Sequence, residues 1–250
     1  MIGVFDSGIG GVTVLNELVK TLPKEHFIYY SDSLNNPYGD KTKEDVIRLS
    51  LNVTKFLIDK GCRIIVIACN TASCSAREYL RGKFPNIKFI VTEPAIKPVY
   101  DYNKDANTLV LATKRTLESD NLKELVDKYH TKNTYLCSME GLADLIEEGN
   151  DYKISLLLNE KLGKYKNLNI DSVVLGCTHY PLIKEKIRNF FPNAKFYDGS
   201  SGVAKQTKRV FKKLNLKSNN KLEIDFYDSS DSDVKKNVFF KHMEVEKWEQ

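Results

Sequence analysis

Long apolar segments are absent from this sequence of 250 residues. No apolar run approaches the roughly 20 residues that span a bilayer, so we expect no contact with a membrane. Residues 1–6 provide neither a basic leader nor the apolar stretch of a signal peptide, which favours a cytoplasmic protein. Cysteine is scarce as well: five residues, an odd number in a chain without an export signal, argue against a disulfide framework and for free thiols.

A strong excess of one charge is also missing. The chain has 38 Lys and Arg against 33 Asp and Glu, a formal net charge of +5, which is mild for this length. The densest basic stretch, 205–221, carries apolar residues at helical spacing and no motif of a nucleic-acid-binding protein. We interpret it as the solvated face of an amphipathic helix and expect no nucleic-acid partner.

Strands alternate with helices along most of the chain, which predicts an α/β protein with parallel sheets that are covered on both faces. The apolar runs predict strands at 2–5, 27–31, 64–68, 87–91, 108–112, 133–136, 172–175, 195–197 and 222–227. Helical periodicity predicts helices at 12–22, 42–60, 70–81, 116–129, 140–148, 152–165, 180–190, 202–214 and 233–242.

One segment of the sequence echoes another. Residues 64–71 and 173–179 are each a buried strand that ends in a cysteine and enters a helix, and the two cysteines, Cys69 and Cys177, lie 108 positions apart. We infer two similar lobes with approximate symmetry, residues 1–95 with 205–250 and residues 96–204. Open α/β sheets bind ligands at the carboxyl ends of their strands, so each cysteine is expected to lie at a ligand-binding edge of its sheet.

The two matched cysteines are the main candidates for chemistry. A thiol at the N-terminus of a helix has its pKa lowered by the helix dipole, which would prepare Cys69 and Cys177 for proton transfer. His179, two residues beyond Cys177, can stabilise a thiolate or relay a proton. The other cysteines, Cys62, Cys74 and Cys137, are predicted to be small buried apolar residues.

Motifs for a bound cofactor or metal are weak. The glycine-rich turn at 6–11 does not fit G-x-G-x-x-G, because Thr13 stands at the last glycine position; Asp32, which follows the second strand, keeps a nicotinamide enzyme as an alternative. Cys69, Cys74, Cys177 and His179 could form a zinc set only with unusual spacing, and no Cys-x-x-Cys occurs. We expect no cofactor and no metal; the backbone N–H groups of the turn suit an amino acid better than a pyrophosphate.

Several motifs taken together resemble the glutamate racemases. They are Asp6-Ser7-Gly8-Ile9-Gly10-Gly11, Asp32 with Pro37-Tyr38-Gly39, Cys69-Asn70-Thr71-Ala72, Glu93-Pro94-Ala95 and Gly176-Cys177-Thr178-His179-Tyr180-Pro181-Leu182. They occur in the family's order within residues 1–210. The resemblance implies two α/β lobes with an active site between them and a cofactor-independent interconversion of L- and D-glutamate. It also implies a supply of D-glutamate for peptidoglycan, and a homodimer.

The resemblance also implies roles for individual residues. Cys69 and Cys177 match the two acid/base thiols, with Asp6 and His179 as their respective helpers. Glu147 matches a third carboxyl group, and its neighbour Glu148 remains the alternative assignment. Substrate-binding positions match Ser7, Asp32, Pro37, Tyr38, Gly39, Asn70, Thr71, Thr113 and Thr178. The chain departs from the family's pattern at Ala112, where glycine is common, and at Cys74, where a small inert residue is common.

The chemistry explains why two thiols are needed. Racemisation removes an α-proton from one face of the substrate and returns a proton to the other, which two thiols on opposite lobes can do without a cofactor. Donors from Ser7, Asn70, Thr71 and Thr178 would stabilise the carbanion in a cleft without water. Two alternatives remain: an aspartate racemase with the same pair of thiols, and a non-catalytic regulator that binds an amino acid.

Overall fold

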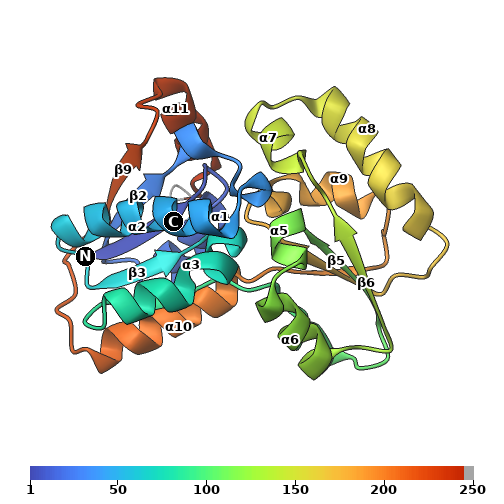
Figure 1. The fold of residues 1–250 in the computed structure, drawn as a ribbon, viewed down its shortest axis with the longest axis horizontal. Helices are drawn as coiled ribbons and strands as arrows, with labels where there is room; N and C mark the ends of the chain where they lie inside the picture. The colour runs from blue at the N-terminus through green and yellow to red at the C-terminus, as the bar shows by residue number, and fades with distance from the viewer. Residues whose placement is uncertain (245–250) are drawn as a thin grey trace.

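In the computed structural model, which describes residues 1–244, the chain forms two parallel sheets, one in each of two lobes (Figure 1). The first sheet has the order β4-β3-β1-β2-β9. Its strands are β1 (Ile2–Asp6), β2 (His26–Ser31), β3 (Ile64–Ile67), β4 (Lys88–Val91) and β9 (Glu223–Asp228). Strands β1 and β3 are buried at every residue, as expected for the centre of a sheet with helices on both faces.

Helices cover both faces of the first sheet. They are α1 (Val12–Thr21), α2 (Lys43–Asp59), α3 (Asn70–Lys83), α10 (Ser200–Lys213) and α11 (Asp233–His242). One apolar cluster joins α1, α10 and α11 to one face, and another joins α2 and α3 to the opposite face. Two short 3₁₀ helices, η1 (Ser33–Asn35) and η2 (Tyr38–Asp40), lie between β2 and α2.

The second sheet has the order β6-β5-β7-β8. Its strands are β5 (Asn107–Ala112), β6 (Asn133–Ser138), β7 (Ser172–Gly176) and β8 (Lys195–Tyr197). Its helices are α4 (Ile96–Tyr102), α5 (Lys114–Leu117), α6 (Asp120–Tyr129), α7 (Leu142–Glu147), α8 (Asp151–Leu162), η3 (Gly163–Tyr165), η4 (Tyr180–Ile183) and α9 (Lys184–Arg188). No helix within residues 1–244 is long and apolar enough to cross a bilayer.

The two lobes repeat one topology. If β9 is left aside, the order of neighbouring strands across the first sheet is β2-β1-β3-β4, and across the second sheet it is β6-β5-β7-β8. In both sheets, therefore, the second strand of the lobe is followed by the first, the third and the fourth. Cys69 follows the third strand of the first lobe, and Cys177 follows the third strand of the second. The predicted α/β class with two parallel-sheet lobes is confirmed, and the repeated topology accounts for the repeated sequence segment.

Two crossings connect the lobes. The chain leaves the first lobe between β4 and α4 and returns between β8 and α10. The crossings touch: a Cβ at Gly199 would lie 2.7 Å from Thr92 Oγ1 and 2.8 Å from the Glu93 carbonyl oxygen. The lobe boundaries predicted at 95/96 and 204/205 remain predictions. Helix α10 packs on α1 of the first lobe, and it begins at Ser200, before the predicted boundary at 204/205.

Some elements differ from the sequence-based expectation. The helix expected at 116–129 is two helices, because Ser119 caps α6 by accepting a hydrogen bond from the Leu122 amide. Helix α4 was not expected, yet Pro98 fits within its first turn, where the missing N–H would have no partner. The helix expected at 180–190 begins as the 3₁₀ helix η4.

Candidate active site

Cys69 and Cys177 lie at one small cavity between the lobes. Its lining comprises Ser7, Asn36, Pro37, Tyr38, Gly39, Cys69, Asn70, Thr71, Thr113, Ala143, Gly176, Cys177, Thr178 and His179. Both cysteines are buried, with 5% and 8% of their surface exposed. The cavity volume of about 20 Å³ has room for roughly one water molecule, so an amino acid could enter only if the lobes moved apart.

Most of the predicted site residues line this cavity, whereas Asp6, Asp32 and Glu147 lie outside its lining. Asn36, Ala143 and Gly176 line it without having been predicted. Gly176 belongs to the motif that contains Cys177 and His179, whereas Asn36 and Ala143 carry no sequence signal of a site. The Oδ1 atoms of Asn36 and Asn70 are buried and have no hydrogen-bond partner among the residues that the structure describes, which leaves polar atoms at the cavity for a polar ligand.

Cys69 caps the N-terminus of α3. Its Sγ accepts a hydrogen bond from the Ala72 amide at 3.4 Å and donates one to Ser7 Oγ at 3.9 Å. Burial, followed by the negative charge of Asp6, nevertheless raises the pKa of Cys69 well above its ordinary value. The predicted lowering of this pKa is wrong for the closed protein, because loss of hydration outweighs the helix terminus.

Asp6 is buried at the end of β1, behind the cavity. Its Oδ2 accepts hydrogen bonds from the Gly11 amide at 2.6 Å and from Thr178 Oγ1 at 3.0 Å, so it connects the glycine-rich turn to the second lobe. Burial raises its pKa, against the effect of His179. Among residues 1–244 its Oδ1 has no hydrogen-bond partner, and its negative charge acts on Cys69.

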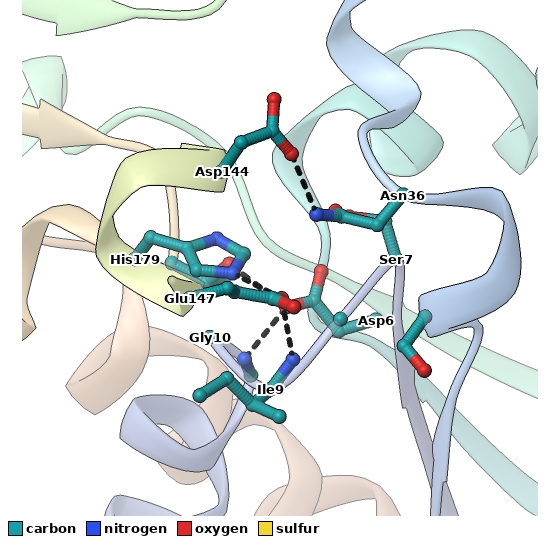
Figure 2. A network of polar contacts seen from close by, with 12 residues as sticks. Asp6, Ser7, Ile9, Gly10, Asn36, Asp144, Glu147 and His179 are labelled. Carbon is teal, nitrogen blue, oxygen red and sulfur yellow. Dashed lines mark hydrogen bonds and ion pairs between the residues drawn. The ribbon is translucent and has the colours of Figure 1, made fainter. Parts of the chain in front are cut away.

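Cys177 begins a chain of polar contacts that crosses between the lobes. Its Sγ lies 3.7 Å from His179 Nδ1, and His179 Nε2 lies 2.9 Å from Glu147 Oε1. The same oxygen accepts a hydrogen bond from the Ile9 amide at 3.0 Å (Figure 2). Glu147 Oε2 accepts one from Lys235 Nζ at 3.0 Å. Cys177 itself precedes the 3₁₀ helix η4 instead of the expected α-helix.

The charges along this chain stabilise one another. Burial alone would lower the pKa of His179, but hydrogen bonds to Cys177 and Glu147 raise it well above its ordinary value. Burial alone would raise the pKa of Glu147, but His179 and Lys235 lower it to about 2. Glu147 is therefore a carboxylate at neutral pH. Its side chain is 7% exposed, whereas Glu148 is exposed, so the geometry favours Glu147 as the third carboxyl group of the site.

The glycine-rich turn makes room for side chains of the second lobe. A Cβ at Gly10 would lie 2.5 Å from His179 Nδ1, and a Cβ at Gly8 would collide with the Glu147 carboxylate. In this closed arrangement Glu147 and His179 fill the glycine spaces of the turn, so the turn presents no free site for a pyrophosphate.

Hydroxyl groups and a buried carboxylate complete the wall of the cavity. Thr71 Oγ1 lies 3.0 Å from Thr113 Oγ1, and this contact joins the two lobes. Thr113 therefore lines the cavity, although Ala112 stands before it where the family commonly has glycine. Asp32 is buried behind Tyr38, whose hydroxyl donates a hydrogen bond to Asp32 Oδ2 at 2.5 Å. Asp32 therefore supports Tyr38 from behind. Among residues 1–244, no group of three or more His, Cys, Asp and Glu side chains is arranged to hold a metal ion.

Known proteins resemble this chain over most of its length. The sequence model of the Asp/Glu/Hydantoin racemase family matches residues 2–207. A protein named glutamate racemase from Clostridium perfringens strain SM101 is 40% identical over 234 residues, 91% of this chain and 90% of its own. One from Clostridium botulinum strain Langeland is 43% identical over 219 residues, 86% and 85% of the two chains. The crystal structure of glutamate racemase from Francisella tularensis in complex with D-glutamate has a TM-score of 0.82, with 31% identity and coverage of 97% and 92%.

Proposed function

The chain belongs to the Asp/Glu/hydantoin racemase family, and from that premise we propose that it interconverts L- and D-glutamate with two thiols as acid and base. One observation carries the proposal: two cysteines at matched positions of two lobes line the same closed cavity. The names of the relatives support glutamate as the substrate, since the Clostridium perfringens proteins that cover 91% of the chain are named glutamate racemase.

The proposed reaction removes one proton from the α-carbon of glutamate and returns another proton to the same carbon. A thiolate at Cys69 takes the α-proton from one face of the substrate, and the thiol of Cys177 gives a proton to the other face. For the other enantiomer the two cysteines exchange roles. The substrate's α-ammonium brings positive charge close to the buried thiols, which offsets the cost of forming a thiolate at Cys69. Hydroxyl and amide donors of Ser7, Asn70, Thr71 and Thr178 stabilise the carbanion.

Each thiol has its own helper in this scheme. His179 Nδ1 faces Cys177 and, as an imidazolium, stabilises the thiolate that remains after Cys177 has given up its proton. Asp6 acts on Cys69 through its negative charge, which raises the pKa of this thiol and so makes its thiolate a stronger base. Asp6 also accepts a hydrogen bond from Thr178, so it connects the two halves of the site.

Incubation with L-glutamate in heavy water, followed by chiral analysis, tests the proposal. We expect D-glutamate that carries deuterium at Cα, formed in the presence of EDTA and without added pyridoxal phosphate. Cys69→Ser and Cys177→Ser are the matched controls and should be inactive. Preferential turnover of aspartate would favour an aspartate racemase, and a lack of α-proton exchange in either acid would favour a binding regulator.

The proposal also includes a cellular role. We propose that the protein supplies D-glutamate for peptidoglycan, in the cytoplasm and as a homodimer. Light scattering on the purified protein tests the dimer, and rescue of a bacterial strain that requires D-glutamate tests the supply.

A further inference from the structure

Lys235 lies at the end of the polar chain that begins at Cys177. Its Nζ is 3.0 Å from Glu147 Oε2, and its side chain is 31% exposed, whereas Glu147 is almost fully buried. The two residues are 88 positions apart. Glu147 belongs to the second lobe and Lys235 to α11, which packs on the first. This ion pair therefore adds a residue from the C-terminal helix to the surroundings of the candidate active site.

Helix α11 holds Lys235 in place through its buried face. Lys235 and Phe239 are four residues apart and so share one side of the helix. Phe239 is fully buried against Tyr29 and Phe226, with ring centroids 4.5 and 4.6 Å away. Tyr29 in turn donates a hydrogen bond to the Gly8 carbonyl oxygen at 2.8 Å. The backbone of α11 at Lys235 is thus held in place relative to the turn that contacts Glu147.

The positive charge of Lys235, next to Glu147, affects the affinity of His179 for its proton. The charged and titratable groups that act on Glu147 or His179 are Asp6 from β1, Tyr29 from β2, Asp144 from α7, Cys177 and Lys235. Within this set of described residues Lys235 supplies the only fixed positive charge. Without it, the imidazolium form of His179 would be favoured more strongly, because the ammonium group of Lys235 would no longer repel the positive charge on the imidazole.

We propose that Lys235 is a positioning residue that balances the charge of Glu147 and so sets the pH range over which the Cys177–His179 pair can both release and take back a proton. Its link to catalysis rests on the proposed function. Lys235 does not line the cavity, so it acts through Glu147 and His179 and not by contact with the substrate.

Three variants separate this role from a merely structural one. Lys235→Gln removes the charge, Lys235→Arg keeps it, and Lys236→Gln removes the charge of an exposed lysine that is its neighbour on the same helix. Because loss of a cation favours every protonated form nearby, both limbs of the kcat/KM profile of Lys235→Gln should move to higher pH by roughly 0.5 to 1 unit. Activity below the optimum should fall roughly three- to tenfold and recover at higher pH.

Nuclear magnetic resonance of ¹⁵N-labelled histidine gives a second readout that needs no turnover. The chain has four histidines, and His179→Asn identifies the signal of His179. In the substrate-free protein, the His179 titration should shift upward in Lys235→Gln and stay at the wild-type position in Lys235→Arg and Lys236→Gln. An unchanged titration in Lys235→Gln, or an equal change in Lys235→Arg, would overturn the inference. Absence of glutamate racemisation with the expected titration would overturn the proposed function alone.

Discussion

The His179 imidazole occupies the space that Gly10 leaves by having no side chain: a Cβ at residue 10 would lie 2.5 Å from His179 Nδ1. This contact joins the turn after β1 to the segment after β7, and therefore the two lobes. His179 holds its place beside Cys177 only while the turn stays this close, so the glycine at position 10 belongs to the geometry of the site.

Gly10→Ala should impair catalysis without unfolding the protein. The added methyl group pushes His179 away from Cys177, and misplacement of a proton-transfer group by about 1 Å costs on the order of 100-fold in rate. Steady-state kcat/KM for both enantiomers measures the effect. Gly82→Ala is the matched control, because a Cβ there would meet no described residue within 4 Å. Equal activities of the two variants would contradict this account of the turn.

Glu147→Gln should flatten the pH dependence of stability on the acid side. The folded protein holds the pKa of Glu147 at about 2, below its ordinary value of 4.5, so the carboxylate stabilises the fold above pH 4.5. That contribution, on the order of 3 kcal/mol, is lost as the pH falls toward 2. Urea unfolding between pH 2.5 and 6 measures it. The exposed Glu148→Gln should keep the wild-type slope, and a Glu147→Gln slope equal to wild type would contradict the burial and pairing of Glu147.

Tyr38→Phe should reduce both stability and substrate affinity. The variant leaves the buried Asp32 Oδ2 without the hydrogen bond that the Tyr38 hydroxyl donates at 2.5 Å, and such a loss costs roughly 1 to 3 kcal/mol. KM should rise, because residues 37–39 line the cavity. Denaturant unfolding and initial rates test both effects. Tyr152→Phe removes a hydroxyl from a side chain that is 74% exposed and should change neither quantity.

The sequence was sufficient to predict those parts of the site that depend on local order. The apolar strands before Cys69 and Cys177 predicted where each thiol lies, since parallel strands deliver the residues after them to one edge of a sheet. The helix that carries Lys235 was likewise predicted at 233–242 with the bounds that the structure has. The contact between Lys235 and Glu147 was not predicted, because the local sequence does not indicate which surface of the protein α11 packs against.

The pKa of Cys69 illustrates the opposite case. A helix terminus can be read from the sequence, whereas the enclosure of the thiol depends on how closely the second lobe approaches, and the enclosure dominates. Asn36 was missed for a related reason. Its partner, Asp144, lies in the other lobe, with Asn36 Nδ2 3.0 Å from Asp144 Oδ1, so its importance arises from the closed arrangement (Figure 2).

Elimination from a glutamate analogue that carries a leaving group beside Cα tests the two-thiol account most directly, because deprotonation alone then completes the reaction. Serine is a far weaker acid than cysteine, so Cys69→Ser and Cys177→Ser should each lose glutamate racemisation. Each variant should still eliminate from one enantiomer of the analogue, and the two should prefer opposite enantiomers. Asp6→Asn should impair the Cys69 direction more, and His179→Asn the Cys177 direction more. The same enantiomer for both serine variants, or normal racemisation by either of them, would contradict two thiols on opposite faces of the substrate.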